Sequence, residues 1–291
     1  MTRARSAPIR FNAYVLAGDP AWAVESIASY YGMVERIVVS FDRSHRSWAG
    51  FPLSVEESLR RIREADPEGK VVLLPGDHVN TGPSVMATET SQRQGALDAA
   101  SDGADWVLQL DTDEILPSPA TLRHQIDLAH AHGAGAVDFP LRNIYAATAG
   151  ARFLEQCGRF WTTQAAYPGP IAVRAGTALS VARQARGVPH HRVDVAARNT
   201  DPAHPRNTAV HAVIPRREAV LHMSWVRTEA QMLEKRTVSG YAKNRDWDRD
   251  LARWRWRSRH PWLTASAAPI SRRWWDRYRV VALPLVSGLD P

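Results

Sequence analysis

The sequence predicts an α/β protein with a mixed, mostly parallel sheet flanked by helices, followed by a C-terminal helical extension. In the first 118 residues, apolar segments of strand length alternate with segments of helical pattern. Repeated β-α-β order favours parallel strands joined by right-handed crossovers. Near the other end the composition changes. Residues 241–291 carry 11 Lys and Arg against 5 Asp and Glu, whereas residues 1–240 carry 26 against 25.

The elements of the first part follow in order from their apolar patterns. Strands are expected at residues 11–17, 36–41, 70–74 and 106–110, and helices at residues 20–31, 54–65 and 88–101. Pro20 suits the first turn of a helix. Ser54, with Glu57 three residues later, predicts a capping box at the start of the second helix.

The pattern changes after residue 136. Strand-like pieces at residues 136–141 and 171–173 are separated by proline and glycine, residues 186–206 are rich in loop formers, and residues 229–241 return to a helical pattern. No internal repeat or low-complexity linker is present. A single α/β domain with a C-terminal extension is therefore the simplest organisation.

Composition is that of a globular protein, since 44% of the 291 residues are hydrophobic and 23% are charged. Cys157 is the only cysteine, which excludes an intramolecular disulfide and favours a reducing compartment. Residues 11–17 are too few for a signal sequence, and residues 280–289 are interrupted by Pro284 and too short to span a bilayer. We expect a cytoplasmic protein.

The most informative feature is a pair of carboxylates, Asp111 and Asp113, directly after the apolar segment at residues 106–110. In open α/β sheets, ligands bind at the carboxyl ends of the strands. Divalent cations that bridge substrate phosphates are usually held by one or two carboxylates, together with phosphate oxygens and water. The pair predicts a metal and phosphate site, although an Asp-x-Asp after a strand is also found in solvated turns.

Several common enzyme motifs are absent. Neither Gly-x-Gly-x-x-Gly after the first strand nor Gly-x-x-x-x-Gly-Lys-Ser/Thr occurs, which argues against a dinucleotide dehydrogenase and a P-loop NTPase. Gly-x-Ser-x-Gly and His-Glu-x-x-His are also missing, which argues against the common serine hydrolases and zinc peptidases.

Four features in sequence order resemble the nucleotide-sugar half of a family 2-like GT-A glycosyltransferase. They are the acidic turn at Asp19, a second strand ending in Asp42, a helix containing Gln92-Arg93-Gln94, and GADWVLQLDTDEIL at residues 103–116. The order and spacing agree over about residues 10–118.

A second match lies downstream. LHMSWVRTEAQMLEKRTVSGYA, residues 221–242, resembles the segment in which a histidine follows a strand and a helix then supplies a lysine. The resemblance implies a GT-A, Rossmann-like domain at residues 1–242, with an acceptor half at about residues 136–242 and a basic extension at residues 243–291.

The resemblance implies a metal-dependent glycosyltransferase that moves a sugar from a UDP- or GDP-sugar to a hydroxyl acceptor, either saccharide or lipid-linked, with Mn²⁺ or Mg²⁺. Asp113 would bind the metal directly. Asp111 would reach it through water or hold the ribose, and Glu114 would point away or brace the loop. His222 would be a third ligand, with a buried structural histidine as the alternative.

The remaining donor contacts follow from the same resemblance. Lys235 and Arg93 would contact the diphosphate, unless they are solvated helix charges. Asp42 would bind the base or ribose, unless it only forms an Asx-turn. Asp19 would contribute from the first turn.

An inverting transfer needs a general base near the acceptor hydroxyl. Glu155 and Asp194 are the candidates, and Asp138, His190 and His191 are weaker ones. A retaining reaction would need no such base.

Two other functions remain open. A sugar-nucleotide pyrophosphorylase-like nucleotidyltransferase would share the sheet and the acidic ligands, but its glycine-rich basic loop is missing at residues 17–21. A non-catalytic nucleotide-sugar-binding module is the other alternative.

The extension alternates arginine with Trp247, Trp254, Trp256, Trp262, Trp274 and Trp275. Three interpretations remain: helices packed on the main domain, an element at a membrane surface, and a nucleic-acid patch. No nucleic-acid-binding motif accompanies the charge, so no nucleic acid is expected. We expect residues 244–278 to cover the acceptor side of the site and to hold the protein peripherally at the inner membrane face.

Overall fold

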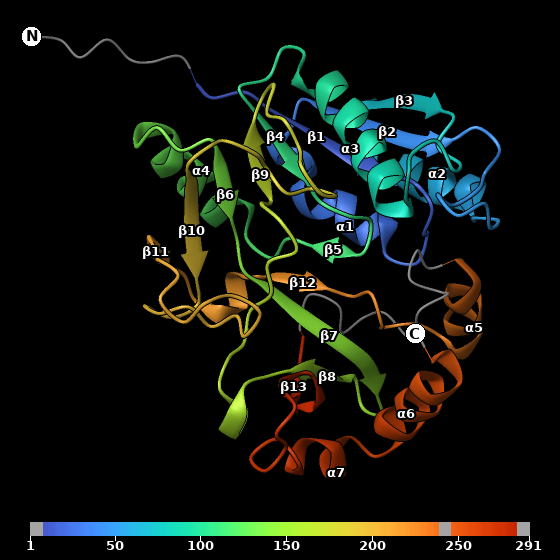
Figure 1. The fold of residues 1–291 in the computed structure, drawn as a ribbon, viewed down its shortest axis with the longest axis vertical. Coiled ribbons are helices and arrows are strands. Elements are labelled where there is room, and N and C mark those ends of the chain that lie inside the picture. The colour runs from blue at the N-terminus through green and yellow to red at the C-terminus, as the bar shows by residue number, and fades with distance from the viewer. Residues whose placement is uncertain (1–7, 239–245, 284–291) are drawn as a thin grey trace, which may run out of the picture.

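The computed structural model describes residues 8–238 and 246–283, which form two sheets that lie one beyond the other along the long axis of the molecule (Figure 1). The first sheet has eight strands in the order β11-β10-β6-β9-β4-β1-β2-β3. These strands are β1 (Phe11–Leu16), β2 (Arg36–Asp42), β3 (Val71–Gly76), β4 (Trp106–Gln109), β6 (Ala136–Asp138), β9 (Ala172–Arg174), β10 (His190–Asp194) and β11 (Ala212–Val213).

All neighbouring strands of this sheet are parallel except β9, which runs antiparallel to both β4 and β6. The expected α/β fold with a mixed, mostly parallel sheet is therefore confirmed. The strands expected at residues 11–17, 36–41, 70–74 and 106–110 are found within two residues of their predicted ends.

Helices cover both faces of the first sheet, and side chains alternate between the two faces along each strand. Ala13 and Val15 of β1 belong to the core cluster that holds Ile27 of α1 (Ala23–Tyr30). The same cluster includes residues of α2 (Val55–Glu64) and α4 (Pro119–Ala131). Tyr14, between them, packs in the cluster of Leu97 from α3 (Val85–Ser101). Because β1, β2 and β4 are buried on both faces, most of their residues are apolar.

The capping box expected at Ser54 is wrong. Ser54 does precede α2, but its hydroxyl makes no cap and instead donates to Glu234 Oε1 of a helix 180 residues later, at 2.7 Å. The helix α3 does begin with a side-chain cap, since Ser84 Oγ accepts from the Ala87 amide at 3.1 Å.

The second sheet has five strands in the order β13-β8-β7-β12-β5. They are β5 (Glu114–Ile115), β7 (Leu141–Thr148), β8 (Arg152–Gln156), β12 (Val220–His222) and β13 (Tyr278–Ala282). The single strand expected at residues 136–141 is divided, because β6 ends before Phe139-Pro140 and β7 crosses into the second sheet. The stretch at 186–206, expected to be loop, contains β10.

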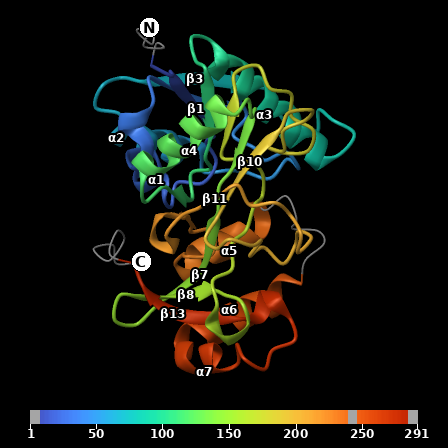
Figure 2. The ribbon, with the colours of Figure 1, turned by 90° about the vertical axis from the view of Figure 1, so that its left-hand side faces the viewer.

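Helices of the C-terminal part cover one side of the second sheet (Figure 2). They are α5 (Glu229–Val238), α6 (Trp247–Arg259) and α7 (Pro261–Ser266), and the part of the helix expected beyond Val238 lies outside the described residues. Single turns of 3₁₀ helix occur at η1 (Tyr31–Met33), η2 (Arg159–Trp161), η3 (Arg216–Glu218) and η5 (Trp274–Asp276). In the described part of the chain no helix has the length and apolar character needed to cross a membrane.

The extension is anchored by its first two tryptophans. Trp254 is 7% exposed and donates from Nε1 to the carbonyl of Trp225 at 3.1 Å. Trp247 stacks on the ring of Trp225, with centroids 6.1 Å apart. The chain then returns through β13, which pairs antiparallel with β8. The helical extension is thus joined to the second sheet, and the packing interpretation holds for Trp247 and Trp254.

Candidate functional site

A pocket of about 330 Å³ opens at the carboxyl ends of β1, β2 and β4. The chain leaves β1 at Ala17 and β2 at Asp42, and both turns line the pocket, as do residues 111–113 after β4. The opposite wall comes from Arg227 and from Gln231, Glu234 and Lys235 of α5. The pocket lies beside β1, an interior strand of the sheet, at the carboxyl ends of the parallel strands, which is the usual ligand position in this architecture.

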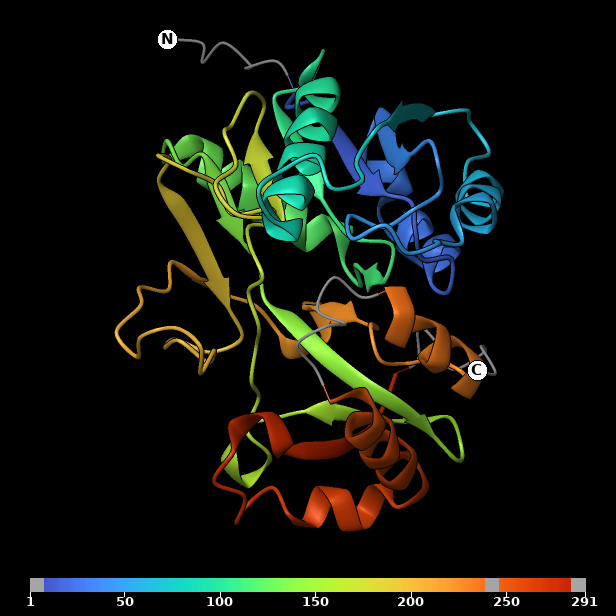
Figure 3. The same cartoon turned by 45° about the vertical axis from the view of Figure 1, so that its right-hand side comes forward.

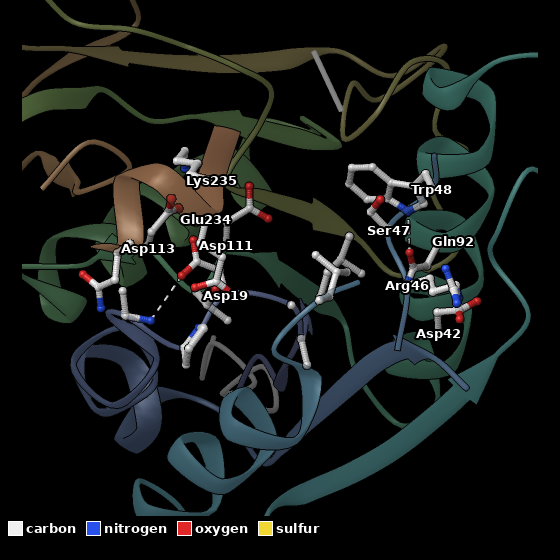
Figure 4. A pocket seen from close by; sticks show the side chains of 18 of the residues that line it. Asp19, Asp42, Arg46, Ser47, Trp48, Gln92, Asp111, Asp113, Glu234 and Lys235 are labelled. Atoms are coloured by element: carbon white, nitrogen blue, oxygen red, sulfur yellow. Dashed lines mark hydrogen bonds between the residues drawn. The ribbon is translucent and has the colours of Figure 1, made fainter. Parts of the chain in front are cut away.

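The two ends of the pocket differ in chemistry (Figure 4). Trp48, Gln92 and Asp42 lie at one end, and Asp19, Asp111, Asp113 and Lys235 lie at the other. The first end therefore combines the indole ring of Trp48 with the amide of Gln92 and the carboxylate of Asp42, and the second is more densely charged.

A buried ion pair shapes the loop that carries the two aspartates. Glu114, 1% exposed, accepts from both terminal nitrogens of Arg183, at 2.7 and 2.6 Å. Arg183 also donates to the carbonyl of Gln109 at 2.8 Å, and Glu114 Oε2 accepts from the Asp111 amide at 3.2 Å. Glu114 therefore braces the loop, as expected. Arg183 lies in the loop between β9 and β10, and nothing in its sequence context indicated this role.

Arg93 holds Asp111. Its two terminal nitrogens donate to the two carboxylate oxygens of Asp111, at 2.9 and 3.3 Å, and its Nε donates to Glu89 at 2.9 Å. Burial alone would raise the pKa of Asp111, but Arg93 and Arg183 lower it well below its usual value. The guanidinium of Arg93 is thus committed to Asp111, and its expected contact with a diphosphate is not supported by this geometry.

Arg227 links two of the aspartates. It donates to Asp19 Oδ1 at 2.6 Å, and another of its nitrogens lies 3.5 Å from Asp113 Oδ2. Burial raises the pKa of Asp113, but the charges of His222, Lys235 and Arg227 lower it below its usual value. Arg227 was within the downstream segment that resembled a transferase, yet its spacing alone gave no sign of contact with Asp19.

His222 lies next to Asp113, with Nε2 3.8 Å from Asp113 Oδ1. The other ring nitrogen, Nδ1, lies 3.0 Å from Asn143 Oδ1, and the Asn143 amide donates to Gln156 at 2.9 Å. Because the amide nitrogen of Asn143 is used for Gln156, its oxygen faces the imidazole as an acceptor. In the neutral ring, Nδ1 therefore carries the proton and the lone pair of Nε2 faces Asp113.

The predicted metal ligands Asp113 and His222 are thus brought together from positions 109 residues apart. Asp111 and Asp113 line the pocket, whereas His222 is not among the lining residues. Among the described residues, no group of three or more His, Cys, Asp or Glu side chains is arranged to hold a metal ion. The protein alone offers a carboxylate and an imidazole at this point.

Lys235 and Asp42 also line the pocket. Lys235 Nζ donates to Ser224 Oγ at 2.9 Å. Asp42 forms an Asx-turn, accepting from the Ser44 amide at 2.9 Å, and its second oxygen accepts from the His78 amide at 2.7 Å. Burial raises the pKa of Asp42, but these hydrogen bonds lower it below its usual value. Asp42 thus organises the loops after β2 and β3.

The two residues considered as general bases lie outside the pocket. Glu155, 0% exposed, is surrounded by the guanidinium groups of Arg142, Arg216 and Arg279. Asp194, also 0% exposed, accepts from the Val195 and Thr200 amides. Neither carboxylate faces the pocket or has room for an acceptor, so the geometry does not support either as a base.

The weaker candidates for the general base, Asp138, His190 and His191, also have hydrogen-bond partners within the protein. His190 Nδ1 lies 3.1 Å from Asp138, and His191 Nε2 lies 3.0 Å from Gln125. None of these three residues lines the pocket, because β6 and β10 lie beyond β9, away from β1 and β2.

No protein-family model matches the chain, and no curated protein sequence matches it. Among solved structures, the chain is distantly similar to a mannosyltransferase from Pyrobaculum calidifontis in complex with GDP-Man and Mn²⁺. The TM-score is 0.35 and the identity 17%, over 46% of this chain and 36% of the other. This chain therefore spans about a third of that protein.

A second similar structure is the 4-diphosphocytidyl-2C-methyl-D-erythritol synthase from Anaerococcus prevotii, with a TM-score of 0.30, 10% identity, and 57% and 70% of the two chains covered. A third is the mannose-6-phosphate isomerase from Helicobacter pylori, with a TM-score of 0.29, 11% identity, and 49% and 53% covered. At these low TM-scores and identities, the similar structures say nothing about the chemistry of this chain. That chemistry has to be inferred from the geometry of its own pocket.

Proposed function

We propose that the protein is a glycosyltransferase that binds a nucleotide-diphosphate sugar in the pocket beside β1 and transfers the sugar to a hydroxyl acceptor. The observation that supports this most is that Asp113, Arg227 and Lys235 line one end of the pocket, with His222 3.8 Å from Asp113, while the indole of Trp48 lines the other end. A nucleoside diphosphate needs both kinds of surface.

The aromatic end suits a nucleobase. The indole of Trp48 is fixed by its hydrogen bond to Gln92 Oε1 at 2.6 Å, and Gln92 in turn donates to Ser40 at 3.1 Å. A ring held in this way offers a flat face for base stacking, which tolerates any base. Uracil and guanine donors both remain candidates.

The charged end suits a diphosphate with a divalent ion. Asp113 and His222 would hold Mn²⁺ or Mg²⁺, and an imidazole whose other nitrogen is already hydrogen-bonded is oriented as metal-binding histidines usually are. Phosphate oxygens and water would complete the site, as is common when a protein supplies few ligands. When bound, the ion would offset the negative charge that grows on the departing diphosphate.

The chain's own cations would act on the same group. Arg227 is buried and fixed between Asp19 and Asp113, so it presents its charge without reorganisation. Lys235 lies on α5 across the pocket from β1. Asp111, held by Arg93, is placed to accept from ribose hydroxyls or from water. These cations come from the far end of the chain and not from a phosphate loop after β1, which favours a transferase over a nucleotidyltransferase.

A nucleotide-sugar-binding module without transfer is the second candidate. The observation that favours it is that Glu155 and Asp194 are both buried in structural contacts away from the pocket. Binding would then occur without loss of the sugar.

A donor screen separates these functions. We expect the wild-type protein to release UDP or GDP from at least one nucleotide sugar in the presence of Mn²⁺, and excess chelator to stop the release. Asp113→Asn should reduce the rate by at least a hundredfold, because it removes one of the two metal-binding groups, and circular dichroism should show an unchanged fold.

Binding of a nucleotide sugar without release, with any acceptor supplied, would leave the binding module as the function. If no nucleotide sugar or nucleoside diphosphate bound at all, the proposed function would be wrong in both forms.

A further inference from the structure

The end of the molecule away from the first sheet carries a group of exposed large apolar side chains, which we name the aromatic tip. Its members are each between 45% and 80% exposed: Phe160, Trp161, Trp262, Leu263, Ile270 and Trp275. Scattered exposed apolar residues need no explanation, but a group of this size in one region usually marks an interaction site.

The aromatic tip is built from two segments about 100 residues apart. Trp161 of η2 donates from Nε1 to the carbonyl of Ala265 in α7, at 2.9 Å. Arg159 donates to the carbonyl of Pro269 at 2.9 Å. The fold therefore joins the turn after β8 to the loop around α7, and α7 lies at the extreme lower end of the molecule (Figure 3).

The backbone of the η2 turn is unusual. Phe160 and Trp161 have φ angles of 54° and 57°, in the left-handed region that residues other than glycine rarely adopt. Two successive aromatic residues in this conformation are held there by the contacts of the turn with α7. Strain that the surrounding structure maintains is more common at functional positions than elsewhere. Here the strained backbone belongs to the turn that places Phe160 at the surface, where it is 63% exposed.

The charges around the aromatic tip are almost all positive. Residues 251–283 contain eight arginines and one acidic residue, Asp276, which is paired with Arg257 at 2.8 Å. Arg255 and Arg279 pair with Glu229 and Glu155 of other elements, so the excess of positive charge comes from the other five arginines. Two further arginines from the other segment lie over tip residues. The guanidinium of Arg159 is 5.1 Å from the ring centre of Phe160, and that of Arg152 is 5.8 Å from that of Trp262.

We propose that the aromatic tip docks on the surface of an anionic lipid bilayer, with its aromatic and aliphatic side chains in the interface and its arginines at the lipid headgroups. Tryptophan and arginine are the residue types that favour this zone, because each combines an apolar body with a polar end. An anionic leaflet supplies the opposite charge around every member of the tip. A second copy of the chain would instead bring like charges together.

This surface is separate from the donor pocket. None of the pocket residues comes from the described part of the extension, residues 246–283, so the expectation that the extension covers the site is not supported. Docking can therefore be tested without any assumption about the donor or the reaction.

The test is co-sedimentation of the full chain with vesicles of phosphatidylcholine, with and without phosphatidylglycerol. We expect binding to the anionic vesicles that weakens as salt is raised, because salt screens the attraction of the arginines to the headgroups. Trp262→Ser combined with Leu263→Ser should weaken binding at least tenfold. Both side chains are more than 60% exposed, so the fold should be retained, which circular dichroism would check.

Two controls sharpen the result. Val181→Ser combined with Val213→Ser removes similarly exposed apolar side chains outside the tip, and should bind as the wild type does. Arg272→Gln combined with Arg273→Gln should reduce both the binding and its salt dependence, whereas Arg63→Gln combined with Arg206→Gln should not.

The proposal is overturned if the wild-type chain does not bind anionic vesicles, or if the tip and control variants bind equally. It is also overturned if light scattering shows that the tip variant abolishes a dimer of the wild type without changing vesicle binding. That outcome would assign the surface to a second copy of the chain.

Discussion

At the scale of single residues, the arginines near the pocket differ in what they contact. Arg183 holds Glu114 and does not line the pocket. Arg93 and Arg227 both line the pocket, and each is hydrogen-bonded to a pocket aspartate, Arg93 to Asp111 and Arg227 to Asp19. Sequence alone cannot separate these roles, because the partner of an arginine is set by distant parts of the chain.

The residues that the sequence analysis proposed for the site fall into three groups, which differ in how far the sequence alone could place them. Asp111 and Asp113 follow a strand, and a strand end fixes a position in the sheet, so their place was predictable. His222 and Lys235 were found only through the resemblance of their segment. The candidates Glu155 and Asp194 had no such support, and tertiary contacts occupy both.

One prediction concerns Asn143, which orients His222. Asn143→Ala removes the acceptor for Nδ1, so the imidazole is free to rotate or change tautomer. Loss of such a contact typically costs ten- to a hundredfold in metal affinity. We expect a weaker Mn²⁺ affinity of that size, measured by titration in the presence of a nucleoside diphosphate. Asn207→Ala, at an exposed position, is the control. An unchanged affinity in Asn143→Ala would remove His222 from the site.

At the scale of elements, Glu155 joins three parts of the second sheet. It lies on β8, while Arg142 comes from β7, Arg279 from β13 and Arg216 from η3. This carboxylate therefore ties the C-terminal strand, and with it the extension, to the rest of the sheet. Burial raises the pKa of Glu155, but Arg142 and Arg279 lower it from 4.5 to about 2.

A prediction for stability follows from this contact. Glu155→Gln should lower the free energy of unfolding by about 3 kcal/mol at pH 7, since it leaves buried guanidinium groups without their counter-charge. The pKa is lower in the folded state than in the unfolded chain. The contribution of the ionised group is therefore complete above pH 5 and disappears as the pH falls from about 4.5 to about 2.

Urea denaturation of both proteins across this pH range measures the effect. The difference in unfolding free energy should shrink steadily as acid is added. A difference that stayed constant with pH, or no difference at pH 7, would show that the carboxylate charge does not stabilise the fold.

The elements also differ in how well the sequence predicted them. β1, β2 and β4 are largely apolar because they are buried in the first sheet, whereas the edge strand β3 is apolar although Val72 and Leu73 are exposed. In contrast, β8 and β13 mix charged and apolar residues, because one side chain of each enters the arginine–glutamate cluster. The strands β5, β11 and β12 have two or three residues each. They are defined by their pairing with neighbouring strands rather than by a pattern of their own. Their sequences contain too little pattern to predict them.

At the scale of the whole molecule, the two proposed functions belong to different parts of the protein. The pocket is lined by the turns after β1, β2 and β4 and by residues of α5. The helix α7, which carries part of the aromatic tip, lies beyond the second sheet (Figure 1). The α/β class was predictable from the order of elements. The second sheet was not, because it assembles strands from residues 114 to 282.

The central claim is that a divalent ion at Asp113 and His222 mediates the binding of a nucleoside diphosphate. Calorimetric titration of UDP and GDP into the wild type, Asp113→Asn and Asp77→Asn, with Mn²⁺ or with excess chelator, tests it most directly. Asp77 is the control, since its side chain is 79% exposed and outside the pocket. We expect one nucleotide to bind the wild type and Asp77→Asn only with Mn²⁺, and to bind Asp113→Asn at least tenfold more weakly. Full-strength binding in excess chelator, or equal affinity in Asp113→Asn, would contradict the claim.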